Sequence, residues 1–291
     1  MTVCIVAINQ KHRVTAFATD RMVTSTFPPI EFEHSLPKLT QISNHCIALS
    51  AGDAIKGKEI FDAVRETSQK ANLPIAQIAE QVKEMYQRKR LQILEAQLLR
   101  SRGINHQIFI EAGAKLLPPA VYSQIDHAFA TFMLPLELII AGVDESGPSI
   151  YGIRNPGLVD CYNSIGFHAI GSGSMHALIS LIQTYAPVIS VVETLYAVFR
   201  AQRVAQVAPG VGEETDLGMV CSTEKVKYFD EKTELIIKFN ELYEQEKDAR
   251  KDLITKWKLA TLSVDEKGKF VEQISNRNLQ SETHKTKEKV E

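Results

Sequence analysis

The chain has 291 residues, of which 44% are hydrophobic and 23% are charged, a balance typical of a soluble globular protein with a full core. Its formal net charge of -2 at pH 7 gives no reason to expect nucleic acid as a partner, because binding to phosphates requires a basic surface. The longest apolar run, over residues 132–143, contains Pro135 and Glu137 and is too short to span a bilayer, so we expect no membrane segment.

The first fifty residues predict two β-hairpins. Apolar, β-rich runs at residues 3–8 and 14–19 are separated by a polar turn. A second pair of runs follows at residues 38–42 and 45–50. Two successive hairpins indicate an antiparallel sheet.

The middle of the chain predicts helices over residues 54–71 and 75–102. The second helix carries a stripe of leucines at helical spacing: Leu91, Leu94 and Leu98. Residues 103–135 have mixed periodicity and leave their assignment open.

Strands and a second helix pair follow. We expect strands at residues 137–141, 149–153, 168–170, 217–221 and 226–229, and helices at residues 175–185 and 191–207. Hairpins that alternate with helix pairs favour α+β layers over a parallel α/β sheet.

The C-terminal part differs in composition. A helix predicted over residues 231–263 is rich in charge and bears one apolar stripe, made of Leu235, Phe239, Leu242, Ala249, Leu253 and Trp257. The stripe would either dock on its own domain or contact another subunit. Residues 264–291 are polar and are predicted to be disordered.

The N-terminal residues lack the basic segment and apolar core of a signal peptide. The four cysteines form no C-x-x-C pair: Cys4, Cys46, Cys161 and Cys221. Three of them lie in apolar runs, which favours reduced, buried thiols. We therefore expect a protein of the reducing cytoplasm.

Thr2, which follows Met1, is the first residue that suggests chemistry. Removal of Met1 would leave a threonine with a free α-amine, whose pKa lies near 8. That amine could accept the proton of the threonine hydroxyl, so one residue would supply both nucleophile and base. By itself a threonine in this position is far more often the ordinary start of a strand.

Three later segments give Thr2 a context. Thr19-Asp20-Arg21 closes the first predicted hairpin, Lys38 opens the second, and residues 49–54 (LSAGDA) end it. With these residues the chain resembles the β-type subunits of the 20S proteasome and their simpler bacterial relatives. That family of N-terminal-nucleophile hydrolases has a terminal threonine, an aspartate after the second strand and a lysine before the third.

The resemblance continues at residues 141–151, 169–174 (AIGSGS) and 209–220. It implies a four-layer α-β-β-α sandwich of two antiparallel sheets over residues 2–230, with a helical segment inserted at about residues 88–130.

The resemblance also implies site roles. Thr2 would attack the scissile carbonyl, and Lys38, held by Asp20, would supply nearby positive charge. The backbone N–H of Gly52 would bind the oxyanion, where one donor is worth ~3 kcal/mol, and Ser172 would orient the terminal amine. Implied substrate-binding residues are Val23, Thr24, Ser50 and Ala54.

The chain departs from the family at two places. Arg21 directly follows the aspartate, and Met22 stands where the family has arginine. The family's later Asp-x-x-Ser pair has no aspartate in residues 206–212.

No cofactor or metal is expected. The eight histidines form no H-x-H or H-x-x-x-H pair. The acidic cluster of Glu213, Glu214 and Asp216 is more typical of a solvated loop than of a metal site.

These features predict a threonine-type endopeptidase that acts on peptides or unfolded proteins within a homo-oligomeric ring. The resemblance also allows an ATP-dependent unfoldase as a partner. Two alternatives stay open: a peptide ligase or transpeptidase on the same fold, and a non-catalytic scaffold subunit.

Overall fold

The computed structural model describes residues 2–26, 29–33, 38–71, 73–186, 189–221, 226–229, 232–256, 261–264 and 270–273. The chain divides into a compact unit over Met1–Ile236 and a second unit over Ile237–Glu291. Every candidate site residue lies in the first unit. Among the described helices, none is both long and apolar enough to cross a membrane.

The first sheet is antiparallel and has the strand order β10-β1-β2-β11-β12. Its strands are β1 (Cys4–Asn9), β2 (Val14–Asp20), β10 (Phe167–Ile170), β11 (Thr215–Cys221) and β12 (Lys227–Phe229). Every residue of β1 and β2 is buried, as expected for strands whose sheet is covered on both faces.

The second sheet is also antiparallel, with the order β5-β6-β7-β8-β9. Its strands are β5 (Leu39–Ser43), β6 (Cys46–Gly52), β7 (Leu136–Asp144), β8 (Gly147–Arg154) and β9 (Leu158–Cys161). Both predicted hairpins are present. They lie in different sheets, with β1 and β2 in the first and β5 and β6 in the second.

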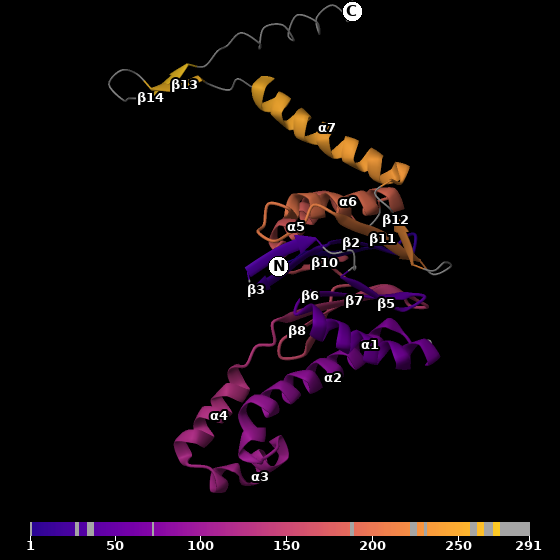
Figure 1. The fold of residues 1–291 in the computed structure, drawn as a ribbon. Coiled ribbons are helices and arrows are strands. Elements are labelled where there is room, and N and C mark those ends of the chain that lie inside the picture. The colour runs from indigo at the N-terminus through magenta and orange to yellow at the C-terminus, as the bar shows by residue number, and fades with distance from the viewer. Residues whose placement is uncertain are drawn as a thin grey trace, which may run out of the picture. The chain divides into compact units, whose positions relative to one another are not determined.

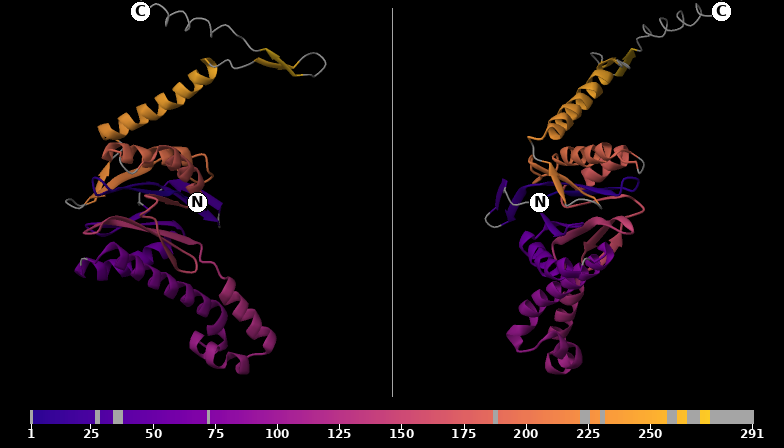
Figure 2. Two further views of the ribbon diagram at one scale, coloured as in Figure 1. Left: turned by 180° about the vertical axis from the view of Figure 1, so that it is seen from behind. Right: turned by 90° about the vertical axis from the view of Figure 1, so that its right-hand side faces the viewer.

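Helix pairs cover the outer faces of the two sheets (Figures 1 and 2). The pairs are α1 (Ala54–Ala71) with α2 (Ile75–Leu94), and α5 (Ser174–Thr184) with α6 (Val191–Ala205). The predicted antiparallel sheets and helix pairs are thus confirmed, and the arrangement is compatible with a two-sheet sandwich.

Alternation along β7 explains how the layers hold together. Leu138 and Ile140 belong to the apolar cluster that includes buried residues of α1 and α2. Ile139 and Ala141 belong to the cluster that joins the two sheets. Each fully buried large aliphatic side chain contributes about 1.5–3 kcal/mol to stability, so β7 is held on both faces.

The inserted segment is a small helical lobe with its own core. The helix predicted to Arg102 changes its winding after Leu94, through a π-helical turn over Glu95–Leu99 and a 3-10 turn over Arg100–Arg102. Helices α3 (His106–Leu116) and α4 (Pro119–Thr131) follow in the stretch left unassigned from sequence. Their core is formed by Leu99, Phe109 and Ile125.

Two leucines of the stripe predicted in the second helix pack within the chain. Leu94 is buried within the chain, and Leu98 packs against the core of the helical lobe. These two leucines therefore help to stabilise the fold of a single chain.

The sequence did not predict the hairpin of β3 (Met22–Thr26) and β4 (Pro29–Glu33), nor β9. In β3 and β4, Val23 is paired with Phe32 and Thr24 with Glu31. Pro28 and Pro29 obscured the pattern in the sequence, because proline is uncommon inside strands.

The boundaries of the C-terminal helix and of the tail after it differ from the predicted ones. Helix α7 spans Glu234–Lys256 and is followed by a hairpin of β13 (Thr261–Val264) and β14 (Phe270–Gln273). The helix therefore ends earlier than residue 263, and the predicted tail contains a strand. Leu242 of the apolar stripe is exposed, whereas Trp257 lies outside the described residues.

His168 in β10 should make the fold sensitive to acid. Its ring stacks on Tyr162 with 3.7 Å between ring centroids, and burial lowers the pKa of His168 to about 4. Between pH 6.5 and pH 4 the unfolded chain takes up a proton that the native chain does not. Unfolding free energy therefore falls as pH falls through this window, by at most about 3 kcal/mol.

We expect His168→Gln to reduce this acid-dependent loss. Urea unfolding at pH 7.5, 5.5 and 4.5 measures it in both proteins. An equal loss in the variant and the unmodified chain would contradict the assignment to His168.

Candidate active site

Strand ends from both sheets meet at one end of the two-sheet core. Thr2 precedes β1 and Asp20 ends β2, and the antiparallel pairing of these strands brings the two residues together. On the facing sheet, Lys38 precedes β5 and its carbonyl accepts a hydrogen bond from Ser50 N at 3.3 Å. Cys4 Sγ donates to Ser50 O at 3.4 Å and links the sheets.

The carboxylate of Asp20 is fully buried and is surrounded by donors. Its Oδ1 accepts from Thr2 Oγ1 at 2.5 Å and from Val3 N at 2.8 Å. Its Oδ2 accepts from Met22 N and Gly212 N, each at 3.1 Å. This shell compensates the cost of burying a charge and fixes the carboxylate beside the Thr2 hydroxyl.

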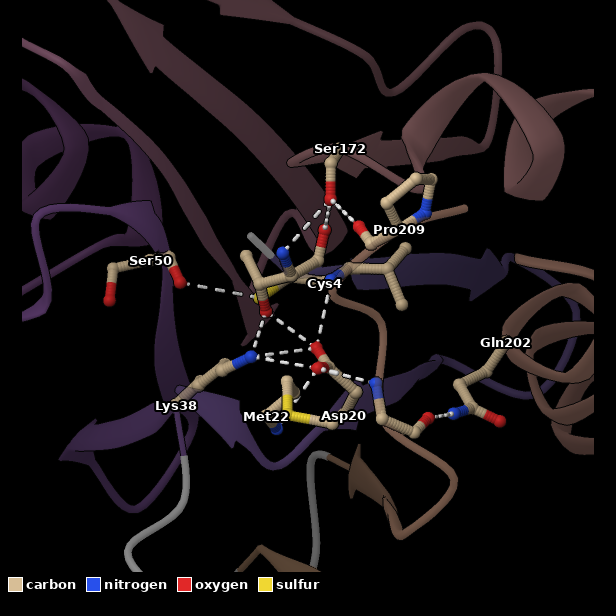
Figure 3. Close-up of polar contacts among 11 residues, drawn as sticks. Cys4, Asp20, Met22, Lys38, Ser50, Ser172, Gln202 and Pro209 are labelled. Atoms are coloured by element: carbon tan, nitrogen blue, oxygen red, sulfur yellow. Dashed lines mark hydrogen bonds and ion pairs between the residues drawn. The ribbon is translucent and has the colours of Figure 1, made fainter. Parts of the chain in front are cut away.

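Lys38 completes the group. Its Nζ lies 2.8 and 2.9 Å from the two oxygens of Asp20 and also donates to Thr2 Oγ1. Figure 3 shows the Lys38 and Asp20 side chains pointing toward each other. Since the Lys38 side chain is only 12% exposed, water screens its positive charge weakly, and that charge acts directly on the Thr2 oxygen.

Ser172 holds the backbone of Thr2 from the other side. Thr2 N donates to Ser172 Oγ at 3.1 Å, and that hydroxyl lies 3.3 Å from Thr2 O and 3.4 Å from Pro209 O. Gly173 N also donates to Thr2 O at 3.2 Å. The nitrogen of Thr2 is therefore fixed in place near its own hydroxyl.

Two glycines are required by close approaches of the backbone. Gly171 has φ +93°, and a Cβ there would lie 2.3 Å from Thr2 O. Gly52 has φ +102°, and a Cβ there would lie 2.1 Å from Pro135 O. Gly52 ends β6, two residues after Ser50, and makes no hydrogen bond to Thr2 within the described part of the chain.

The structure thus brings together Thr2, Asp20, Lys38 and Ser172, with Ser50 alongside. Ala54 begins α1 and is exposed. Val23 and Thr24 lie in β3, but their side chains are outside the described ones.

Two members of the predicted acidic cluster, Glu214 and Asp216, form ion pairs with Arg21 instead of lying in a solvated loop. Arg21 lies 2.6 Å from Asp216 and 3.0 Å from Glu214, and the hydrogen bond with Asp216, helped by Glu214, raises the pKa of Arg21. Arg21 therefore ties the end of β2 to β11. Sequence could not reveal this pair, because its members are almost 200 positions apart.

Cys4 lies next to the site without being reactive. It is buried, and burial raises the pKa of Cys4 to about 12. Because the thiolate is the nucleophilic form, the thiol of Cys4 stays protonated at neutral pH, which leaves the hydroxyl of Thr2 as the candidate nucleophile.

Comparison with models of known protein families gives no match. A comparison with curated proteins likewise finds no relative.

Proposed function

We propose that the chain is an N-terminal-nucleophile hydrolase of the proteasome-like α-β-β-α type, and that it acts as a threonine-type endopeptidase. The observation that carries this proposal is the set of contacts around Thr2. Its Oγ1 touches both Lys38 Nζ and Asp20 Oδ1, while its nitrogen is bound to Ser172 Oγ. A buried ion pair adds little net stability to a fold, so stability alone is a poor reason for the Lys38–Asp20 pair. The pair also contacts the Thr2 hydroxyl, and this contact favours a catalytic role.

The first step is attack by Thr2 Oγ1 on the scissile carbonyl. The free α-amine of Thr2 takes the hydroxyl proton, and the Lys38 charge stabilises the developing alkoxide. The carbonyl oxygen becomes an oxyanion, for which we assign the Gly52 N–H as donor. Collapse of this intermediate breaks the C–N bond, and the leaving amine takes the proton held by the α-ammonium.

The second step releases the acyl group. The α-amine removes a proton from water, and the resulting hydroxide attacks the ester carbonyl. The ester C–O bond breaks, Thr2 Oγ1 recovers a proton, and the peptide leaves as a carboxylate. Attack by an amine instead of water would give the ligase alternative from the same ester.

This chemistry requires cleavage of the bond between Met1 and Thr2. A peptide nitrogen has no available lone pair for a proton, whereas an α-amine with a pKa near 8 does. Ser172 already bonds that nitrogen at 3.1 Å, so the amine would be oriented as soon as it forms.

Backbone groups occupy the place of the missing Asp-x-x-Ser pair and favour catalysis over a scaffold role. Pro209 O lies 3.4 Å from Ser172 Oγ, and Gly212 N donates to Asp20 Oδ2 at 3.1 Å. The same turn therefore contacts both Ser172 and Asp20. A homo-oligomeric ring around such sites stays part of the proposal.

A peptide epoxyketone tests the proposal, because it reacts with both the hydroxyl and the free amine of an N-terminal threonine. We expect intact mass to show a mature chain that begins at Thr2 and gains one inhibitor, with the label mapped to Thr2. The control is protein with an extra segment retained before Thr2, which should stay unlabelled. A free Thr2 amine that fails to react would overturn the proposal.

A further inference from the structure

Glu137 occupies an unusual place on β7. It is paired with Ala51 of β6, and two residues further on, Ile139 is paired with Leu49. Ala51, Leu49 and Ile139 all belong to the apolar cluster between the two sheets. Because side chains alternate along a strand, Glu137 continues this inward-facing row as a carboxylate where the apolar core ends.

The carboxylate lies beside the candidate active site. Its Oε2 accepts a hydrogen bond from Gly171 N at 3.0 Å, and Gly171 packs directly against the carbonyl of Thr2. Glu137 is exposed, unlike the other residues of its row, and so can be reached from solvent.

Glu137 supplies an exposed negative charge next to the site. Among the described residues it makes no ion pair, and the Lys38 cation is bound by Asp20. A fixed charge of one sign at the mouth of a site attracts ligands of the opposite sign.

We propose that Glu137 selects peptides with a lysine or arginine side chain close to the scissile bond. One carboxylate oxygen is held by Gly171 N–H, which orients the other toward an incoming ammonium or guanidinium group. The inference rests on the proposed function, because it requires that peptides bind next to Thr2.

Glu137→Gln separates charge from shape. The glutamine side chain has the same length, and its carbonyl oxygen can still accept from Gly171 N–H, whereas the negative charge is lost. Glu145→Gln is the matched control, because it removes the same charge from the turn at the opposite end of β7.

The experiment compares kcat/KM for fluorogenic peptides that differ only by lysine, norleucine or glutamate beside the scissile bond. We expect the unmodified protein to prefer lysine over norleucine by about tenfold or more, which is ~1.4 kcal/mol. Glu137→Gln should remove most of this preference and Glu145→Gln should keep it. The preference should also weaken as salt rises, since the carboxylate is exposed.

Labelling of Thr2 by a neutral epoxyketone separates the two proposals. If Thr2 is labelled but lysine and norleucine peptides are cleaved equally well, or if Glu137→Gln keeps the lysine preference, the inference about Glu137 is wrong and the proposed function stands. If Thr2 is never labelled, the proposed function fails and the inference about Glu137 fails with it.

Discussion

Replacing Thr2 with alanine should reduce peptide hydrolysis by at least about 1000-fold, the scale seen when a catalytic nucleophile is removed. In the proposed mechanism Thr2 Oγ1 is the reacting atom, and Cys4, the nearest thiol, stays protonated because burial raises the pKa of Cys4 to about 12. Steady-state cleavage of a fluorogenic peptide measures the loss. A variant that keeps more than about a tenth of the original kcat, only ~1.4 kcal/mol of barrier, would show that Thr2 is not the nucleophile.

Thr2→Ser is the matched variant, because it keeps the hydroxyl and removes only a methyl group. We expect it to retain measurable turnover and to be labelled by the epoxyketone. Thermal unfolding should show that Thr2→Ala is folded, since Asp20 keeps its bonds to Lys38 and to the backbone. Loss of activity in a folded Thr2→Ala protein, together with activity in Thr2→Ser, assigns the effect to the hydroxyl oxygen.

Lys38→Ala is expected to have the second largest effect, a loss of about 100-fold or more in kcat. The substitution removes the positive charge that contacts Thr2 Oγ1, so the alkoxide is no longer stabilised as it forms. It also leaves the fully buried carboxylate of Asp20 without its cation, which can cost about 3–5 kcal/mol of stability. Activity and urea unfolding must therefore be measured together.

A double variant keeps this test decisive if Lys38→Ala does not fold. Lys38→Met with Asp20→Asn removes both charges while keeping similar side-chain volumes, so no buried charge is left unpaired. We expect it to be folded and inactive. A folded double variant with near-normal kcat would exclude the proposed role of the Lys38–Asp20 pair. Lys56→Ala, which breaks a more exposed ion pair with Asp53, is the control and should stay active.

Local patterns were sufficient for most of the fold near the site. The apolar runs of β1 and β2 and the helical periodicity of α1 depend on neighbours close in sequence, so their positions were predicted within a few residues. Helix α2 begins where predicted but ends at Leu94 instead of residue 102. Asp20 and Lys38 lie at the edges of predicted strands, and the resemblance in motifs is what pointed to them as site residues. The β3–β4 pair was missed, since two consecutive prolines in the sequence, Pro28 and Pro29, interrupt the alternation expected of a strand.

The helical lobe marks a second limit of sequence reasoning. Leu91, Leu94 and Leu98 recur at helical spacing, and spacing alone cannot tell a surface stripe from a buried one. The π-helical turn over Glu95–Leu99 changes which residues face the same side, so Leu99 enters the core of the lobe with Phe109 and Ile125. Only the packing of α3 and α4 decided that assignment.

By itself, the sequence determined most strands and helices of the two sheets and their helix pairs, the order of the first two hairpins, and the positions of Thr2, Asp20 and Lys38 at strand ends, because these follow from short-range periodicity. The tertiary structure decided which strand ends meet. Gly212 reaches Asp20 across 192 positions, and Gly171 reaches Glu137 across 34. The first contact depends on the pairing of β2 with β11 and the second on how the two sheets pack face to face, and no local pattern of side chains encodes contacts between groups so far apart.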